Sequence, residues 1–287
     1  MSLHPECVPC IMKQALNTAT VSNVNNNAER FEILRRVYCE IQNVNDDFTA
    51  PGFSKIIQNI VRSFSKIEDP YKETKIQNTK RALQYIPYLR TYIESSADKL
   101  EKAIRVAILG NIIDVGANPD FNLEDEVGKI SSTNIVLDDY TFFEKDLKNA
   151  DYILYIGDNA EEAVFDKLLI EQLAPRKVIF AVREAPVLND ITIDFARGLG
   201  MDSVSEIISS GSSIPGTDMN AVSEKFKHLF YNAPMVIAKG QGNYETLLNE
   251  QRPIYFLFKV KCSVIAEMCR KPIGTSMLYY NKKNNVL

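Results

Sequence analysis

Apolar positions in the first 118 residues recur at helical spacing. Segments 31–41 and 54–64 each place their apolar side chains on one face of a helix. Further helices are predicted over residues 71–86, where Pro87 ends the pattern, and over residues 96–113. Almost no strand pattern occurs in this half. We therefore predict an all-helical amino-terminal domain over residues 1–118.

The pattern changes after Asp120, where short apolar runs of strand length alternate with amphipathic segments. Alternation of this kind is typical of a parallel sheet covered by helices on both faces. Strands are predicted over residues 152–156, 177–182, 203–208, 235–238 and 254–258, and helices over 160–173, 191–199, 222–231, 243–248 and 264–269. The predicted fold class is α/β and Rossmann-like, with a parallel or mostly parallel sheet over residues 119–287. The boundary between the two domains is expected between residues 110 and 130.

Composition excludes several classes of protein. The 287 residues are 45% hydrophobic and 24% charged, as expected for a folded globular chain rather than a disordered one. The net charge of −4 and the absence of clustered Lys and Arg argue against nucleic acid as a partner. No apolar run approaches the ~20 residues that span a bilayer, and the amino terminus lacks signal-peptide features, so we expect a cytoplasmic protein with no membrane partner. Nothing in the sequence indicates its oligomeric state.

Cysteine and histidine are few. Five cysteines, an odd number scattered along the chain, are expected to be reduced thiols, and two histidines are too few for a His-rich zinc site. Cys7 and Cys10 form a CxxC motif, which is half of a zinc site. Cys39 or Cys262 could complete it, and a redox role is also conceivable. Two free thiols on the first helix are the interpretation that we favour.

The residues that follow each predicted strand are the ones to inspect, because ligands bind at the carboxyl ends of the strands in open α/β sheets. Asp158 and Asn159 follow the first strand, on the turn that opens the next helix. A carboxylate and an amide oxygen are hard ligands, suited to Mg²⁺, Mn²⁺ or a similar ion. Capping of the helix is an equally common role for both residue types.

The second strand ends in a similar acidic turn. Asp190 lies there, with Arg183 before it and Asp194 one helical turn after it. Asp190 could complete a set of two carboxylates and an amide around one metal ion. Alternatively, Asp190 caps the next helix and Asp194 is a solvated side chain. Two neighbouring strands that both end in acidic turns favour the metal site.

The fourth strand leads into Lys239, Gly240, Gln241, Gly242 and Asn243. The glycines would let backbone N–H groups approach a phosphate at a helix amino end, and Lys239 would add a positive charge. The loop has neither the Walker A pattern nor GxGxxG, which argues against tightly specified ATP or dinucleotide binding. The alternative is a plain glycine turn with an exposed lysine.

Two further groups could contribute to the same site. Ser210 lies in the Ser/Gly-rich loop after the third strand, whose hydroxyls and amides could line an oxyanion pocket. Asn111 and Asp114, near the end of the last amino-terminal helix, could face the cleft between the domains or form a satisfied polar pair within that helix.

Six ordered motifs together resemble one family. They are CVPC at 7–10, DPY at 69–71, GNIIDVG at 110–116, GDNAEEAVFD at 157–166, APVLNDIT at 185–192 and KGQGNYETL at 239–247. The chain resembles the damage-control phosphatase family of metal-dependent phosphatases, formerly a domain of unknown function and acidic-residue methyltransferase-like, in its compact archaeal-type branch. The resemblance covers essentially the whole chain, although each motif alone is weakly specific.

The resemblance implies a site and an activity. Asp158, Asn159 and Asp190 would hold a divalent metal, Mn²⁺, Co²⁺, Ni²⁺ or Mg²⁺, and Lys239 would contact the substrate phosphate. The substrates would be small phosphorylated metabolites, often sugar phosphates or damaged cofactors. Glu161 stands where many relatives have a small residue, and many carry Lys or Gly near Arg183. Both differences could change which substrate is accepted.

The resulting hypothesis is a phosphoric monoester hydrolase. The metal would polarise a phosphoryl oxygen and activate water, with Asp158, Asp190 and Lys239 as the catalytic residues. The residues expected to contact substrate are Lys239, Gly240, Asn243, Arg183 and Ser210. Direct attack by water and an aspartyl-phosphate intermediate both stay open.

Two alternatives belong to other classes of protein. A protein carboxyl methyltransferase would need an adenosyl-methionine site, and no glycine-rich turn for one follows the first strand. A non-catalytic sensor would bind metal and metabolite in the same cleft without turnover.

Overall fold

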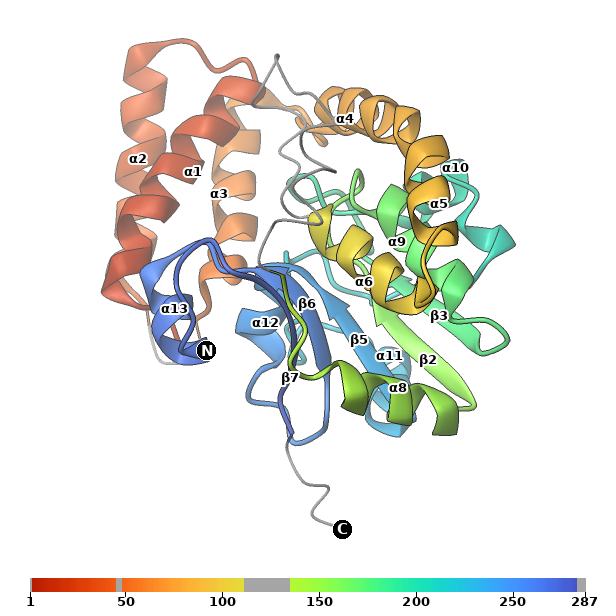
Figure 1. The fold of residues 1–287 in the computed structure, drawn as a ribbon. Helices are drawn as coiled ribbons and strands as arrows, with labels where there is room; N and C mark the ends of the chain where they lie inside the picture. Colours follow the sequence, from red (N-terminus) through yellow and green to blue (C-terminus); the bar gives the residue numbers. More distant parts are fainter. Residues whose placement is uncertain (1, 45–47, 111–134, 283–287) are drawn as a thin grey trace.

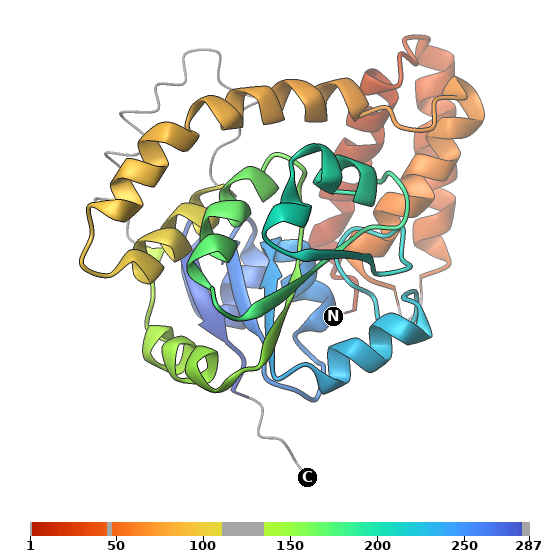
Figure 2. The same cartoon turned by 90° about the vertical axis from the view of Figure 1, so that its right-hand side faces the viewer.

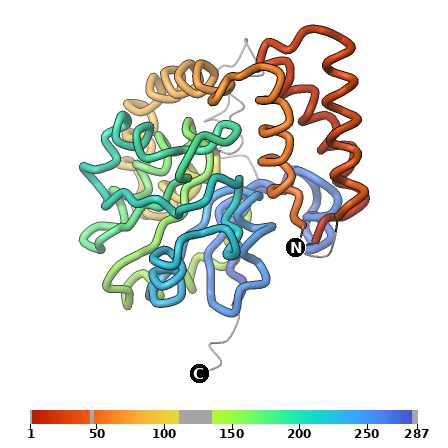
Figure 3. Tube along the Cα trace, turned by 180° about the vertical axis from the view of Figure 1, so that it is seen from behind, coloured from red at the N-terminus to blue at the C-terminus, as the bar shows by residue number. Residues whose placement is uncertain are grey.

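The amino-terminal helices form two groups. The structure, a computed structural model, describes residues 2–44, 48–110 and 135–282. After a short 3₁₀ turn, η1 (Pro5–Cys7), come α1 (Val8–Val21), α2 (Asn27–Gln42) and α3 (Ala50–Ser65). These three helices have a hydrophobic core of their own, which includes Ile11, Val37 and Phe53. Figure 3 shows them, in red to orange, standing beside the rest of the molecule.

The next three helices belong to the sheet instead. They are α4 (Lys72–Gln84), α5 (Ile86–Glu94) and α6 (Lys99–Leu109). Buried residues of all three, such as Ala82, Leu89 and Ile104, share one core with Ile153 and Phe165 of the α/β region. Figure 2 shows α4 and α5 crossing over one edge of the α/β region. The boundary predicted at residue 118 lies outside the described residues.

The centre of the molecule is one seven-stranded sheet in the order β1-β7-β6-β5-β2-β3-β4 (Figure 1). The strands are β1 (Ile135–Val136), β2 (Tyr152–Ile156), β3 (Lys177–Val182), β4 (Glu206–Ser209), β5 (Met235–Lys239), β6 (Tyr255–Lys259) and β7 (Ser276–Tyr280). Every pairing is parallel except β6 with β7. The predicted α/β class with a mostly parallel sheet is confirmed.

Helices cover both faces of the sheet. One face packs against α6, α8 (Tyr140–Asn149), α9 (Ala163–Gln172) and α10 (Ile193–Gly198). The other packs against α11 (Glu224–Asn232), α12 (Gly240–Leu247) and α13 (Ser263–Cys269). Successive residues of β2 point to opposite faces, so Tyr155 joins the first core and Leu154 joins the second. Burial on both faces explains the continuous apolar strands in the sequence.

Several predicted bounds need correction. The strands predicted over 152–156 and 177–182 have the bounds expected. The strand predicted over 203–208 begins later, because Met201–Ser203 forms a 3₁₀ turn, η2, before β4. The helix predicted over 71–86 is α4, which ends at Gln84, and Pro87 lies in the first turn of the separate helix α5, where the N–H that proline lacks has no partner within the helix. β1, β7, α5 and α8 were not predicted. No described helix is long and apolar enough to cross a membrane.

Candidate active site

The three predicted metal ligands lie together at the carboxyl ends of β2 and β3. These strands are parallel neighbours, with Ile156 opposite Ala181. Beyond the strands, the two turns are joined by backbone hydrogen bonds. The N–H of Ile191 donates to the carbonyl of Asp158 at 2.9 Å, and the N–H of Ala160 donates to the carbonyl of Asn189 at 2.9 Å. Asn159 therefore stands directly opposite Asp190.

Neither turn uses these side chains as helix caps. The N-cap position of α9 is Glu162, three residues beyond Asn159, and it makes no side-chain capping bond. The N-cap position of α10 is Thr192, again without a side-chain capping bond. The capping interpretation of Asp158, Asn159 and Asp190 is therefore wrong. Asp194 is exposed on α10, as its solvated interpretation expects.

Asp158 is the least satisfied of the three side chains. It is partly exposed, and within the described residues its carboxylate accepts no hydrogen bond. Partial removal of the carboxylate from water raises its pKa well above the usual range, and repulsion from Glu162 and Asp190 raises it further. A cation placed beside Asp158 would relieve both effects.

Asn159 is held with its amide oxygen available. Its Nδ2 donates to Oε1 of Glu162 at 2.7 Å. Glu162 is 2% exposed, so this bond is shielded from water. Because the nitrogen is occupied, the orientation leaves Oδ1 of Asn159 as the free acceptor.

Asp190 is paired with Arg183. The two side chains are 3% and 1% exposed, and Nε of Arg183 donates to Oδ2 of Asp190 at 2.7 Å. Two further bonds fix the guanidinium, to Oγ1 of Thr217 at 3.3 Å and to Oδ1 of Asn243 at 3.4 Å. Burial raises the pKa of Asp190, and the charge of Arg183 opposes that effect. Arg183 is therefore buried and paired with Asp190, and its contact with substrate stays a prediction.

Gly240 makes room for Asp158. Its φ is +79°, and a β-carbon at this position would lie 1.8 Å from Oδ2 of Asp158. Both the backbone conformation and the space therefore require glycine. The predicted glycine turn is the first turn of α12, which begins at Gly240.

Lys239 is buried among acids. Its Nζ donates to Oδ1 of Asp166 at 2.5 Å and to Oε2 of Glu162 at 3.3 Å, and no part of the side chain is exposed. Tyr155 donates its hydroxyl to the same oxygen of Asp166 at 2.8 Å. Burial alone would lower the pKa of Lys239, but Asp166 and Glu162 raise it above the usual value. The exposed lysine of the alternative interpretation is therefore wrong, and the contact with phosphate stays a prediction.

The side of α4 that faces the site is polar. No role in the site was predicted for this helix from the sequence. Its buried residues are Lys75, Asn78, Thr79 and Ala82. Nζ of Lys75 lies 2.8 Å from Oδ2 of Asp69, and its charge lowers the pKa of Asp190. A signal was present in the sequence, because positions 75, 78, 79 and 82 share one helical face that would be apolar in an ordinary core helix.

Asn243 and Ser210, which were also predicted to contact substrate, make hydrogen bonds to the backbone. Nδ2 of Asn243 donates to the carbonyls of Lys239 at 2.7 Å and Gly157 at 3.2 Å, which ties α12 to the end of β2. Oγ of Ser210 is buried and accepts from the N–H of Ser212 at 3.3 Å. All five cysteines are free thiols. Asn111 and Asp114 lie outside the described residues.

The donor set fits a hard divalent cation. Over the described parts of the chain, no three His, Cys, Asp or Glu side chains gather as a metal cluster. The set formed by Asp158, Asn159 and Asp190 instead holds two carboxylates and one amide, the oxygen donors that Mg²⁺ and Mn²⁺ accept with water completing the shell. The carboxylate of Asp158, which is partly exposed and accepts no hydrogen bond from a described residue, is the observation that agrees with such an ion.

Comparison with known proteins identifies relatives over the full length. A model of the damage-control phosphatase ARMT1-like domain matches residues 3–277. An uncharacterised protein of Methanocaldococcus jannaschii is 31% identical over 97% of this chain and 95% of its own length. A protein of Pyrococcus horikoshii named damage-control phosphatase is 30% identical over 98% of this chain and 99% of its own length.

A solved structure shares the fold. The crystal structure of a DUF89 family protein from Pyrococcus horikoshii superposes with a TM-score of 0.88 at 29% identity, covering 98% of this chain and 100% of that chain.

Proposed function

Because the chain belongs to the damage-control phosphatase ARMT1-like domain family, we propose that it hydrolyses small phosphorylated metabolites with the help of a divalent metal ion. Asp158, Asn159 and Asp190 would hold that ion. The observation that carries the proposal is their convergence at one edge of the sheet, where none of them caps a helix and the carboxylate of Asp158 has no described hydrogen-bond partner.

Each neighbouring side chain has a supporting task in this proposal. A bound divalent ion, Mn²⁺, Co²⁺, Ni²⁺ or Mg²⁺, would supply the Lewis acidity that phosphoryl transfer needs. Arg183 favours the charged form of Asp190 and holds its carboxylate at 2.7 Å. Glu162 turns the amide oxygen of Asn159 away from α9. Lys239 in turn holds Glu162, so its contacts favour a positioning role over direct contact with phosphate.

Lys75 is the cation that we assign to the substrate phosphate. It lies on α4, its charge acts on Asp190, and it is 2% exposed. Its described carboxylate partner is Asp69, which leaves further ammonium hydrogens for another acceptor. A cation at this place would stabilise negative charge on a phosphoryl group bound at the metal.

Unpaired buried acceptors favour a hydroxyl-rich substrate. Oε1 of Gln58, Oδ1 of Asp69 and Oε2 of Glu161 are buried without a hydrogen-bond partner. Gln58 and Glu161 are anchored to the loop that precedes Asp190, through the carbonyl of Pro186 at 3.1 Å and the amide of Asn189 at 2.9 Å. Acceptors of this kind need donors, and sugar hydroxyls supply them. Sugar phosphates are therefore the class that we propose to test first.

The test is a panel of phosphate esters. The protein is freed of metal with a chelator and assayed with p-nitrophenyl phosphate and several sugar phosphates, with each of the four metals added in turn. Asp158→Asn should lose more than about a hundredfold of the metal-dependent activity. Asp194→Asn, an exposed carboxylate on α10, is the matched control and should keep it. Full activity of Asp158→Asn, or metal binding without turnover of any ester, would contradict the proposal.

A further inference from the structure

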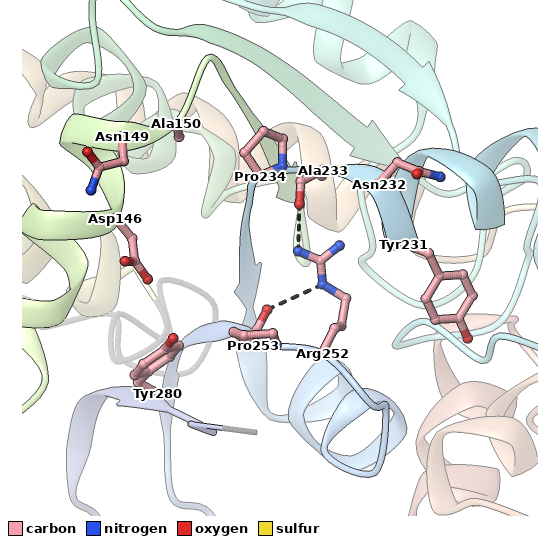
Figure 4. A pocket seen from close by; sticks show the side chains of 10 residues that line it. All are labelled: Asp146, Asn149, Ala150, Tyr231, Asn232, Ala233, Pro234, Arg252, Pro253 and Tyr280. Atoms are coloured by element: carbon pink, nitrogen blue, oxygen red, sulfur yellow. Dashed lines mark hydrogen bonds between the residues drawn. The ribbon is translucent and has the colours of Figure 1, made fainter. Parts of the chain in front are cut away.

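A second pocket lies at the opposite edge of the sheet from the candidate active site. Its volume is about 500 Å³, and it is lined by Asp146, Asn149, Ala150, Tyr231, Asn232, Ala233, Pro234, Arg252, Pro253 and Tyr280 (Figure 4). Pro234 precedes the first residue of β5, whereas Lys239 ends that strand beside the active site. The strand separates the two sites by ~13 Å.

Arg252 is a buried cation in the wall of this pocket. It is 7% exposed. Its Nη2 donates to the carbonyl of Ala233 at 2.8 Å, its Nε donates to the carbonyl of Pro253 at 3.3 Å, and its guanidinium lies 5.1 Å from the ring centroid of Phe230. Its Nη1 is buried with no hydrogen-bond partner among the described residues.

The contacts of Arg252 leave its charge unbalanced. Burial lowers its pKa to about 10, and the groups that oppose this effect are the hydroxyls of Tyr152 and Tyr231 rather than a carboxylate. A buried charge without a counterion is costly, and structures normally pair it. An anion is therefore the missing partner.

The other wall of the pocket offers an acceptor. Figure 4 shows Asp146 and Tyr280 on one side of the pocket and Arg252 on the other. Oδ2 of Asp146 accepts the hydroxyl of Tyr255 at 2.6 Å, which holds the carboxylate in place. A ligand that spans the pocket meets a cation at one end and a carboxylate at the other. It should therefore carry an anionic group and a separate hydrogen-bond donor.

We propose that this pocket is a binding site for a small hydroxylated carboxylate, whose carboxylate group pairs with Arg252 and whose hydroxyl donates to Asp146. The site is independent of the metal site, because Pro234 and Pro253 precede β5 and β6, at the ends of these strands opposite the metal site. It also stands apart from the proposed phosphatase activity, since it requires neither metal nor turnover.

Isothermal titration calorimetry of the full-length, metal-free protein with D-glycerate tests the site. Saturable binding is expected, and propionate, which lacks hydroxyls, should bind several-fold more weakly. Arg252→Gln should weaken glycerate binding at least about tenfold. Asp158→Asn should bind as the unmodified chain does, which shows that the heat does not come from the active site.

A second variant tests the site without changing Arg252, in case Arg252→Gln fails to fold. Asn149→Asp adds a negative charge to the exposed rim of the pocket, leaves Arg252 in place and should weaken glycerate binding several-fold. Circular dichroism of each variant reports on folding. Four results would overturn the proposal. They are no saturable binding, equal affinity for propionate, loss of binding in Asp158→Asn, and unchanged affinity in Asn149→Asp or in a folded Arg252→Gln.

Discussion

The carboxylate of Asp158 rests against the α-carbon of Gly240, so that a β-carbon at residue 240 would stand 1.8 Å from Oδ2. Gly240→Ala should therefore displace the carboxylate of Asp158 and strain a backbone with a φ of +79°. We expect metal-dependent phosphatase activity to fall by more than about tenfold, with a higher metal concentration needed for half-maximal activation. Activity titrated with Mn²⁺ measures both.

Gly242→Ala is the matched control for this variant. It lies two residues further along α12, where an added β-carbon would meet its nearest neighbour, the backbone nitrogen of Gly216, at 3.4 Å. That distance is ordinary van der Waals contact. Equal effects of the two substitutions would show that α12 tolerates no side chain here for reasons unrelated to Asp158.

Glu162→Gln should weaken metal binding without removing a ligand. Glu162 accepts from Asn159 at 2.7 Å and from Lys239 at 3.3 Å, so it sets which end of the Asn159 amide faces the metal. Side chains that orient metal ligands typically contribute 10- to 100-fold in affinity, and we expect a loss of about that size. Glu171→Gln on the same helix, which pairs with the half-exposed Arg90, should have little effect. An unchanged metal requirement in Glu162→Gln would rule out the positioning role.

Lys239→Met should mainly destabilise the fold. The substitution leaves the fully buried Asp166 without its cation, and breaking a buried ion pair in this way costs about 3–5 kcal/mol. Urea denaturation should show the loss, and adding Asp166→Asn should recover part of it, because the stranded charge is then absent. Normal stability with only a raised KM for phosphate esters would restore the direct phosphate contact first predicted for Lys239.

The strands and the proximity of Asp158 to Asp190 could be predicted from the sequence because both depend on local patterns. β2 and β3 are continuous apolar runs, and parallel neighbours end at the same edge, so Asp158 and Asp190 had to lie close together. β7 was not predicted. It follows α13 in the chain and pairs antiparallel with β6, and this pairing cannot be read from the periodicity of the sequence. The helix end near Pro87 was predicted, but α5 was not, because proline is found both after the end of a helix and in the first turn of the next one.

The supporting shell of the site could not be predicted, because its contacts join distant positions. Lys239 and Asp166 are 73 residues apart in the chain, and their pairing depends on the end of β5 lying next to α9. Without that contact Lys239 looked like a free cation beside a glycine turn. The environment of Arg183 could not be predicted either. Its interaction with Asp190 is local, but its burial depends on the distant residues Thr217 and Asn243.

Lys75→Met should impair turnover of substrate more than it changes the metal requirement. Lys75 contacts Asp69 rather than any of the three ligands, yet its charge reaches Asp190. Loss of one charge-assisted hydrogen bond to a phosphoryl group is worth about 1.5–3 kcal/mol, which corresponds to a 10- to 100-fold fall in kcat/KM.

Lys80→Met, on the exposed side of the same helix, is the control for the loss of charge and should leave kcat/KM unchanged. Steady-state kinetics at saturating Mn²⁺, with thermal melts to confirm folding, measure the effect. A purely structural role for Lys75 would lower stability and leave kcat/KM of the folded fraction unchanged. That result would show that α4 does not contact the substrate, and a residue at the ends of the strands would then have to bind the phosphate.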